Sequence, residues 1–161
     1  MDGVSVAASA VSIGAACLKL STLLYQWIEE TRGSDETIKT LANELKTLST
    51  ILDVVKTCSQ SRPGNPKSVA EHEQDLWRLV QRTVDDCGTT TEKLEKILGG
   101  ISHRKGIGLT ITNFQLTIHS EKMSRLREHL QTNKGVLQIT LQTISVYESP
   151  PGLLLDSHNY C

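Results

Sequence analysis

The sequence predicts an all-α fold, an antiparallel bundle of four to five helices with an apolar, small-residue-rich N-terminal helix. Three observations lead to this prediction. Apolar residues recur three and four apart along most of the chain, which is the period of an amphipathic helix. No segment alternates apolar and polar residues for long, as a half-buried strand would. Glycine, proline and serine cluster between the periodic segments and mark the turns.

The first helix is predicted over residues 4–31. From Gly3 to Ile28 the sequence carries one charged residue, Lys19, and its first two-thirds consists of Ala, Ser, Val and Gly rather than Leu. Gly33 ends this helix, and Ser34 is expected to cap the next one. Because the turn is short, the first two helices should be antiparallel neighbours.

The second helix is predicted over residues 35–58. Six of its apolar residues alternate three and four apart and form a heptad-like seam: Ile38, Leu41, Leu45, Leu48, Leu52 and Val55. The segment SQSRPGNPK, which has two prolines and a glycine, is predicted to be a loop.

The third helix is predicted from Ser68 to the glycines at 99 and 100, because Ser68 and Glu71 have the spacing of a capping box. Gly88 and the three threonines after it mark a point where this helix could kink. A glycine-interrupted connection and a short piece at 112–119 lead to the last helix, over 120–147. Its seam is Met123, Leu126, Leu130, Leu137, Leu141 and Ile144, with polar Asn133 at the intervening position.

The predicted organisation is one helical bundle domain over residues 1–148, followed by a tail or linker over 149–161. Pro150 and Pro151 end the last helix. A domain of this length can bury a core without disulfides or metal. The four cysteines, Cys17, Cys58, Cys87 and Cys161, include no C-x-x-C pair, so we expect reduced thiols in a cytosolic protein.

Composition and motifs argue against several function classes. The formal net charge is −1, and the chain has one Phe, two Trp and three Tyr. We therefore expect no nucleic-acid partner. HEQDL at His72 lacks the second histidine of a zinc protease motif, and GISHRKGI lacks the second glycine and the Ser or Thr of a P-loop. We expect no catalytic residue, cofactor or metal site, and a protein that is not an enzyme.

The first helix is the candidate functional element. From Gly3 to Ile28 it would be about 39 Å long, enough to cross a hydrocarbon layer of roughly 30 Å. Lys19 opposes insertion by about 2.5–3.5 kcal/mol, so constitutive insertion is not expected. Two interpretations stay open: a core helix of a soluble bundle, or a helix that enters lipid conditionally.

Two groups of residues in this helix carry the membrane hypothesis. The residues that would enter the membrane are Val4, Val6, Val11, Ile13, Leu18, Lys19, Leu20, Leu23, Leu24 and Trp27. The small residues that would let helices pack closely recur every four positions: Ala8, Ser12 and Ala16 in one row, and Ala10 and Gly14 in another.

The opening DGVSVAASAVSIGAACLKLSTLLYQWI resembles the HeLo-like N-terminal domain of fungal STAND (NLR-like) proteins. The matching residues are Asp2, Val4, Ser5, Val6, Ala7, Ala8, Ser9 and Gly14. The segment EKMSRLREHLQTNKGVLQITLQ, residues 121–142, resembles the last helix of that family, and the resemblance covers about 1–147. The chain departs from the family at Gly3, where a proline is usual, and in TITNFQLTIH, where only Phe114 is aromatic.

The resemblance implies a non-enzymatic cell-death effector domain of fungal incompatibility or innate-immunity proteins. Such a domain would oligomerise with itself, insert its N-terminal helix into membrane lipids, and work with an attached or associated STAND receptor module. It would move from the cytoplasm to the plasma membrane on activation. The alternative is a non-lytic helical module for oligomerisation or adaptor binding, in which the first helix is permanent core. A small-molecule-binding bundle ranks last, because no polar cluster supports it.

Overall fold

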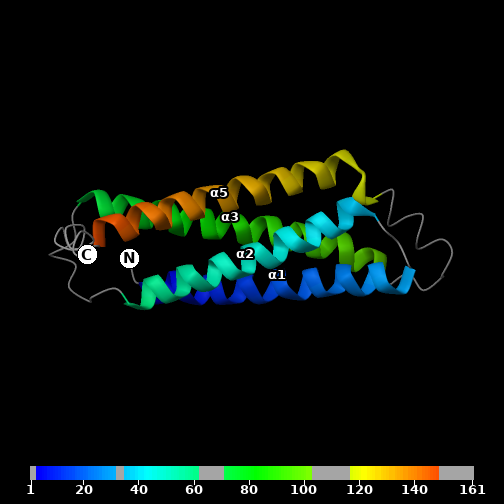
Figure 1. The fold of residues 1–161 in the computed structure, drawn as a ribbon, viewed down its shortest axis with the longest axis horizontal. Helices are drawn as coiled ribbons and strands as arrows, with labels where there is room; N and C mark the ends of the chain where they lie inside the picture. The colour runs from blue at the N-terminus through cyan, green and yellow to red at the C-terminus, as the bar shows by residue number, and fades with distance from the viewer. Residues whose placement is uncertain (1–2, 32–34, 62–70, 103–116, 149–161) are drawn as a thin grey trace, which may run out of the picture.

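The computed structural model describes residues 3–31, 35–61, 71–102 and 117–148. Within these ranges the chain forms four long helices and no strand, which confirms the all-α class (Figure 1). The helices are α1 (Gly3–Thr31), α2 (Glu36–Ser61), α3 (Glu71–Ser102) and α5 (Glu121–Glu148). The expected tail at 149–161, the start of the third helix at Ser68 and the aromatic Phe114 lie outside the described residues.

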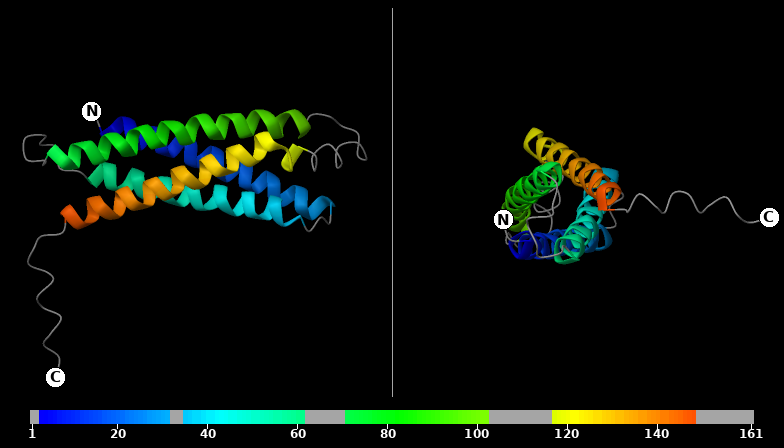
Figure 2. Two further views of the ribbon diagram at one scale, coloured as in Figure 1. Left: turned by 90° about the horizontal axis from the view of Figure 1, so that it is seen from above. Right: turned by 90° about the vertical axis from the view of Figure 1, so that its left-hand side faces the viewer.

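The helices alternate in direction along the bundle axis, with α1 and α3 running one way and α2 and α5 the other (Figure 1). α1 packs against α2 and α3, and α5 packs against α3 and α2. The order around the core is therefore α1, α2, α5, α3, as the views along and across the axis show (Figure 2). Two pairs of successive helices pack closely as antiparallel neighbours: α1 with α2, and α3 with α5.

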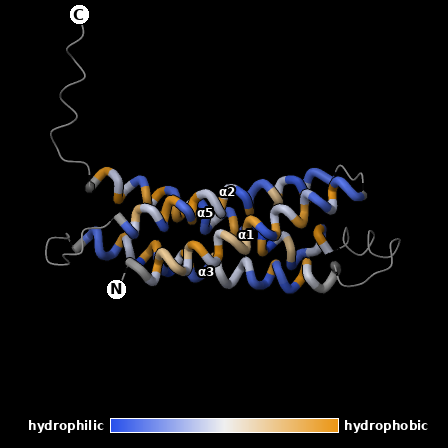
Figure 3. Tube along the Cα trace, turned by 90° about the horizontal axis from the view of Figure 1, so that it is seen from below, coloured by the Kyte–Doolittle hydropathy of each residue, from blue (hydrophilic) through white to orange (hydrophobic). Residues whose placement is uncertain are grey.

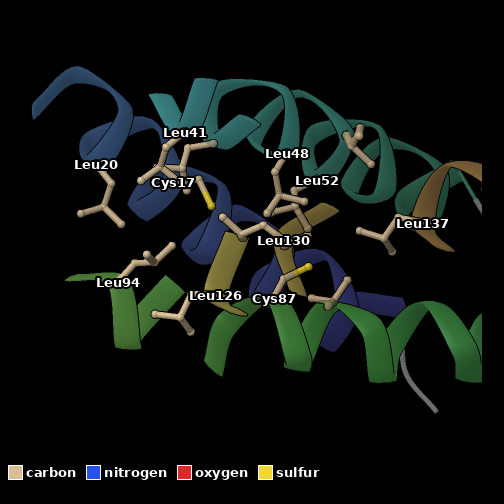
Figure 4. Packing of buried hydrophobic residues seen from close by; sticks show 14 of the residues in the cluster. Cys17, Leu20, Leu41, Leu48, Leu52, Cys87, Leu94, Leu126, Leu130 and Leu137 are labelled. Carbon is tan, nitrogen blue, oxygen red and sulfur yellow. The ribbon is translucent and has the colours of Figure 1, made fainter. Parts of the chain in front are cut away.

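The core is built from the predicted seams. All six seam residues of α2 are buried, and so are Met123, Leu126, Leu130, Leu137 and Ile144 of α5, while Leu141 is partly buried. Figure 3 shows hydrophobic residues recurring between hydrophilic ones along the helices, as expected for amphipathic packing. In Figure 4 leucines from α1, α2, α3 and α5 meet in the middle of the bundle.

The cap of α2 differs from the prediction. Asp35 accepts the backbone N–H of Thr37 through Oδ1 at 2.9 Å and caps the helix. The carbonyl of Asp35 accepts the N–H groups of Ile38 and Lys39, each at 3.2 Å. A carboxylate is an equally good cap and also favours the positive end of the helix dipole, so the helix starts one residue later. Ser34 lies outside the described residues.

α3 is one helix through Gly88, as predicted. Gly88 and the threonines after it lie inside one uninterrupted helix that reaches Ser102. The hydroxyls of Thr89, Thr90 and Thr91 donate to the carbonyls four residues earlier, at 3.2, 2.9 and 2.7 Å. These hydroxyls are satisfied inside the helix, so the threonines do not need a break in it.

Candidate functional site: the N-terminal helix and its contacts

The residues expected to enter a membrane do not share one face of α1. Buried in the core are Val6, Leu20 and Leu24. Ile13 and Trp27 pack partly against the core. Exposed to solvent are Lys19 and three apolar residues, Val11 (49%), Leu18 (50%) and Leu23 (38%). The side chain of Val4 lies outside the described residues. The bundle thus buries only part of the apolar surface of α1.

The two predicted rows of small residues also have different positions. Ala10 and Gly14 are buried, whereas Ala8 and Ser12 are exposed and Ala16 is half-buried. Within the bundle only the row of Ala10 and Gly14 lies in the interior. Three further small residues, spaced three or four positions from this row, are also buried: Ala7, Cys17 and Ser21. The periodicity of the sequence did not identify them as packing residues.

The small residues bring α1 and α2 together. A Cβ at Gly14 would lie 3.7 Å from the Cβ of Leu52 and 3.7 Å from the carbonyl oxygen of Ser49. About two turns later, Ser21 Oγ donates to the carbonyl of Ala42 at 2.8 Å. Tyr25 Oη donates to Asn43 Oδ1 near the end of the pair. Because Gly14 has no side chain, the backbone of α1 can lie close to α2 at this point.

The outer face of α1 has its own heptad-like spacing. Five residues three and four apart lie on the solvent side: Ala8, Val11, Ala15, Leu18 and Thr22. This face holds small and apolar side chains in place of the charged residues that usually cover a surface helix. Folding does not require it to be apolar.

Lys19 contacts α3 from the edge of this face. Its Nζ lies 3.1 Å from Oε1 of Glu95, and the two side chains are 67% and 48% exposed. An ion pair this exposed contributes at most about 1 kcal/mol. The ion pair of Lys19 therefore contributes little to the stability of the bundle.

A polar layer crosses the core between α1, α3 and α5. Cys17 Sγ lies 3.5 Å from Thr91 Oγ1, and the thiol of Cys87 has a hydrogen-bond contact with Asn133. Burial raises the pKa of Cys17, and it raises the pKa of Cys87 to about 12, with a smaller contribution from Cys17. Both thiols are neutral near pH 7 and therefore poor nucleophiles. Asn133 is the polar seam position identified in the sequence.

A second polar contact lies between α2 and α5. Glu44 is 8% exposed, and its Oε1 accepts a hydrogen bond from Nε2 of Gln131. Its other oxygen, Oε2, is buried with no hydrogen-bond partner, and so is Nε of Arg127 on α5. Buried polar atoms without partners cost about 1–3 kcal/mol each. This contact therefore stabilises the bundle less than its burial suggests.

A third contact joins the starts of α2 and α5. His119 Nε2 lies 2.9 Å from Oδ2 of Asp35. Burial raises the pKa of Asp35, but the hydrogen bonds from His119 and from the N–H of Thr37, together with the charge of His119, outweigh it. The pKa of Asp35 is therefore lower than its usual 3.8. In the part of the chain that the structure describes, no three His, Cys, Asp or Glu residues could hold a metal ion together.

Comparison with known proteins gives one match. A family model described as pigment biosynthesis cluster protein PigL N-terminal matches residues 1–152. No curated protein matches the chain. No solved structure matches it either.

Proposed function

Because the chain belongs to the PigL N-terminal family of fungal helical domains, we propose that it is a HeLo-like cell-death effector domain of the STAND (NLR-like) type. It acts without enzymatic chemistry, by self-association and by insertion of α1 into membrane lipids. At rest it is a cytoplasmic bundle. On a signal from an attached or associated receptor module it moves to the plasma membrane and permeabilises it, in programmed cell death, incompatibility or innate immunity.

The observation that carries the proposal is the apolar character of α1. Among the described residues, one helix is long and apolar enough to cross a membrane, over Ser5–Glu30, and 39% of its most apolar part is buried in the bundle. Val11, Leu18 and Leu23 are exposed in the resting fold, where apolar side chains gain nothing. A lipid phase would solvate these side chains as well as those now buried.

Association would make insertion less costly. Lys19 disfavours the hydrocarbon layer by about 2.5–3.5 kcal/mol, and the serines of α1 carry hydroxyls that need partners there. Several copies of α1 packed through Ala8, Ser12 and Ala16 would cover these groups. These three residues are not buried in the resting bundle, so they are available for this contact.

A second function is supported by the close packing of α1 on α2. The contact of Gly14 with Leu52 and Ser49 and the buried hydrogen bond of Ser21 are those of a permanent core helix. In that case the domain is a non-lytic module for oligomerisation or adaptor binding. Native-state hydrogen exchange separates the two functions. Early exchange over residues 6–24 is expected for a helix that is released, and exchange as slow as that of α2 for a permanent one.

A leakage assay tests the proposed function. Oligomerised protein is added to dye-loaded liposomes, and Val11→Gln and Leu18→Gln on the outer face of α1 are compared with the original chain. Matched controls are Val54→Gln on α2 and Leu79→Gln on α3, which are 46% and 41% exposed. Exposed substitutions of this kind change stability by about 0.5 kcal/mol or less. We expect leakage to fall at least tenfold for the α1 variants only.

The same assay has a clear negative outcome. Equal leakage from all four variants, in proteins with unchanged melting curves, means that α1 does not carry the activity. Unchanged leakage after deletion of residues 2–20, in a variant that still folds, leads to the same conclusion. The domain would then be the interaction module.

A further inference from the structure

The bundle consists of two helical hairpins, α1 with α2 and α3 with α5, and the two helices of each hairpin run antiparallel (Figure 1). Residues 62–70 make the one covalent connection between them, and this segment holds two prolines and a glycine. The contacts inside the first hairpin differ in kind from those between the hairpins. This difference indicates which helices stay together when the bundle opens.

Inside the α1–α2 hairpin the contacts are close and satisfied. A Cβ at position 14 would lie only 3.7 Å from the Cβ of Leu52, so the two backbones are close. Ser21 is 2% exposed, and its hydroxyl donates to the carbonyl of Ala42. Close packing of this kind makes many dispersion contacts, and the buried hydroxyl of Ser21 has a hydrogen-bond partner. Separating α1 from α2 would lose all of them at once.

Between the hairpins, polar and charged contacts supplement the apolar core. Lys19 pairs with Glu95, Asp35 with His119 and Glu44 with Gln131. The first pair is exposed, and the last leaves Glu44 Oε2 buried without a hydrogen-bond partner. The exposed pair of Lys19 and Glu95 is worth about 1 kcal/mol or less, and the unpaired Oε2 of Glu44 subtracts from the contact with Gln131. In addition, α1 packs more extensively on α2 than on α3, and α5 packs more extensively on α3 than on α2. The weaker boundary of the bundle therefore lies between the hairpins.

Opening this boundary would expose the leucine core. Leu20, Leu41, Leu48 and Leu52 come from one hairpin, and Leu94, Leu126, Leu130 and Leu137 come from the other (Figure 4). Burying a leucine is worth about 1.5–3 kcal/mol, so neither face is stable in water by itself. The surface that fits each face, in shape and in polar partners, is the matching face of another copy of the same chain.

We propose that the α1–α2 hairpin separates from α3–α5 as one unit and packs on the α3–α5 hairpin of a second copy, giving a dimer by hairpin exchange. The proposal deepens the self-association included in the proposed function and rests on that part of it, but not on membrane insertion. Exchange reproduces every contact of the monomer between two chains, so its main cost is the entropy of association. It is therefore favoured by high local concentration, as on a clustered receptor.

The test is an intermolecular disulfide that only exchange allows. In a background with Cys17, Cys58, Cys87 and Cys161 replaced by Ala, one sample carries Ile13→Cys and another carries Gly88→Cys. A Cβ at position 88 would lie 3.5 Å from Cγ1 of Ile13, where the sulfur of the other cysteine would lie. The samples are mixed at high concentration just below the melting temperature and oxidised. We expect a covalent dimer, because α1 of one chain meets α3 of the other.

The matched control uses the contact inside the hairpin. Gly14→Cys and Leu52→Cys are placed in separate chains of the same background; their Cβ atoms would be 3.7 Å apart, within the range for a disulfide. This mixture should give at least tenfold less covalent dimer, because α1 and α2 stay in one chain. If it cross-links as well as the first mixture, α1 exchanges alone and the proposal is wrong. It is also wrong if neither mixture cross-links.

A second pair protects the test against misfolding. A side chain at position 88 would lie 3.1 Å from Cδ1 of Ile13 and could strain the fold. Lys19→Cys and Glu95→Cys lie across the same boundary on the surface and can be joined by a short bifunctional maleimide. Covalent dimer from this mixture supports hairpin exchange. If both variants are folded and no covalent dimer forms, the proposal is wrong. Leakage is measured separately, so failure of the proposed function leaves these outcomes readable.

Discussion

Lys19 Nζ on α1 lies 3.1 Å from Glu95 Oε1 on α3, and the two side chains form an exposed ion pair. Lys19 is also the one charged residue between Gly3 and Ile28. The same residue thus contributes little to the resting fold and opposes insertion into lipid. Its replacement separates these two effects.

Lys19→Leu should leave stability within about 1 kcal/mol of the original, because an exposed ion pair contributes no more than that. Membrane association should rise on the order of a hundredfold, because a charge costing about 2.5–3.5 kcal/mol in the hydrocarbon layer is removed. Liposome co-sedimentation measures the rise. Lys39→Leu, which removes the surface pair with Glu36 on α2, is the control and should not change sedimentation. Equal binding by Lys19→Leu and the original chain would argue against insertion of α1.

Stability should fall in alkaline solution because of Cys87. Its pKa is raised from 9.0 to about 12 by burial first, so the folded state keeps a proton that the unfolded state loses above about pH 9. The free energy of unfolding therefore decreases as pH rises from 9 towards 12. Urea denaturation at pH 7.5 and 10 measures this, and Cys87→Ala should show a smaller decrease. A decrease of the same size in Cys87→Ala would assign it to other groups.

Asp35 should make the bundle sensitive to acid. The pKa of Asp35 is lower in the folded state than its usual 3.8. The ionised carboxylate therefore adds to the free energy of unfolding above pH 3.8, and this stabilisation is lost as the pH falls below 3.8. Asp35→Ala should cost about 1 kcal/mol at pH 7 through loss of the cap of α2. At pH 2.5 the difference from the original chain should shrink. His119→Ala keeps the cap and should have a smaller effect at pH 7, measured by the same urea titration.

Substitution of a glycine inside a helix should change the stability of the protein in a direction that depends on the space around the glycine. Gly135→Ala has nothing within 4 Å of the new methyl group and should stabilise the protein by about 1 kcal/mol. Gly14→Leu should destabilise it by roughly 1–3 kcal/mol, because atoms of Ser49 and Leu52 already lie 3.7 Å from the Cβ position. Thermal unfolding measures both. A neutral Gly14→Leu would mean that α1 and α2 separate easily, against the hairpin proposed above.

The sequence was informative where apolar and polar residues differ clearly. In α2 the seam from Ile38 to Val55 is surrounded by polar residues, so its spacing alone identified the buried side. In α1 nearly every residue is apolar or small, and several faces could be buried. In the bundle, Ala10 and Gly14 are buried and Ala8 and Ser12 are exposed. Which face of α1 is buried depends on where α2 and α3 pack against it, and periodicity does not give this.

Contacts between distant residues could not be predicted from periodicity. Glu44 reads as a surface residue of α2, yet it is buried against Gln131, 87 positions away. His119 and Asp35 meet across 84 positions because of the way the helices are arranged around the core. The hypotheses about membrane insertion of α1 stay predictions, since burial in the resting fold does not measure behaviour in lipid.

Asn133 interrupts the leucine seam of α5 and contacts the thiol of Cys87 inside the bundle. A slip of α5 by one heptad towards its own C-terminal end would carry this amide away from the thiol, and Leu126 would take its place beside the sulfur. Loss of the contact between amide and thiol is unfavourable, so one polar residue favours a single axial alignment of a helix whose leucines alone would fit in more than one way.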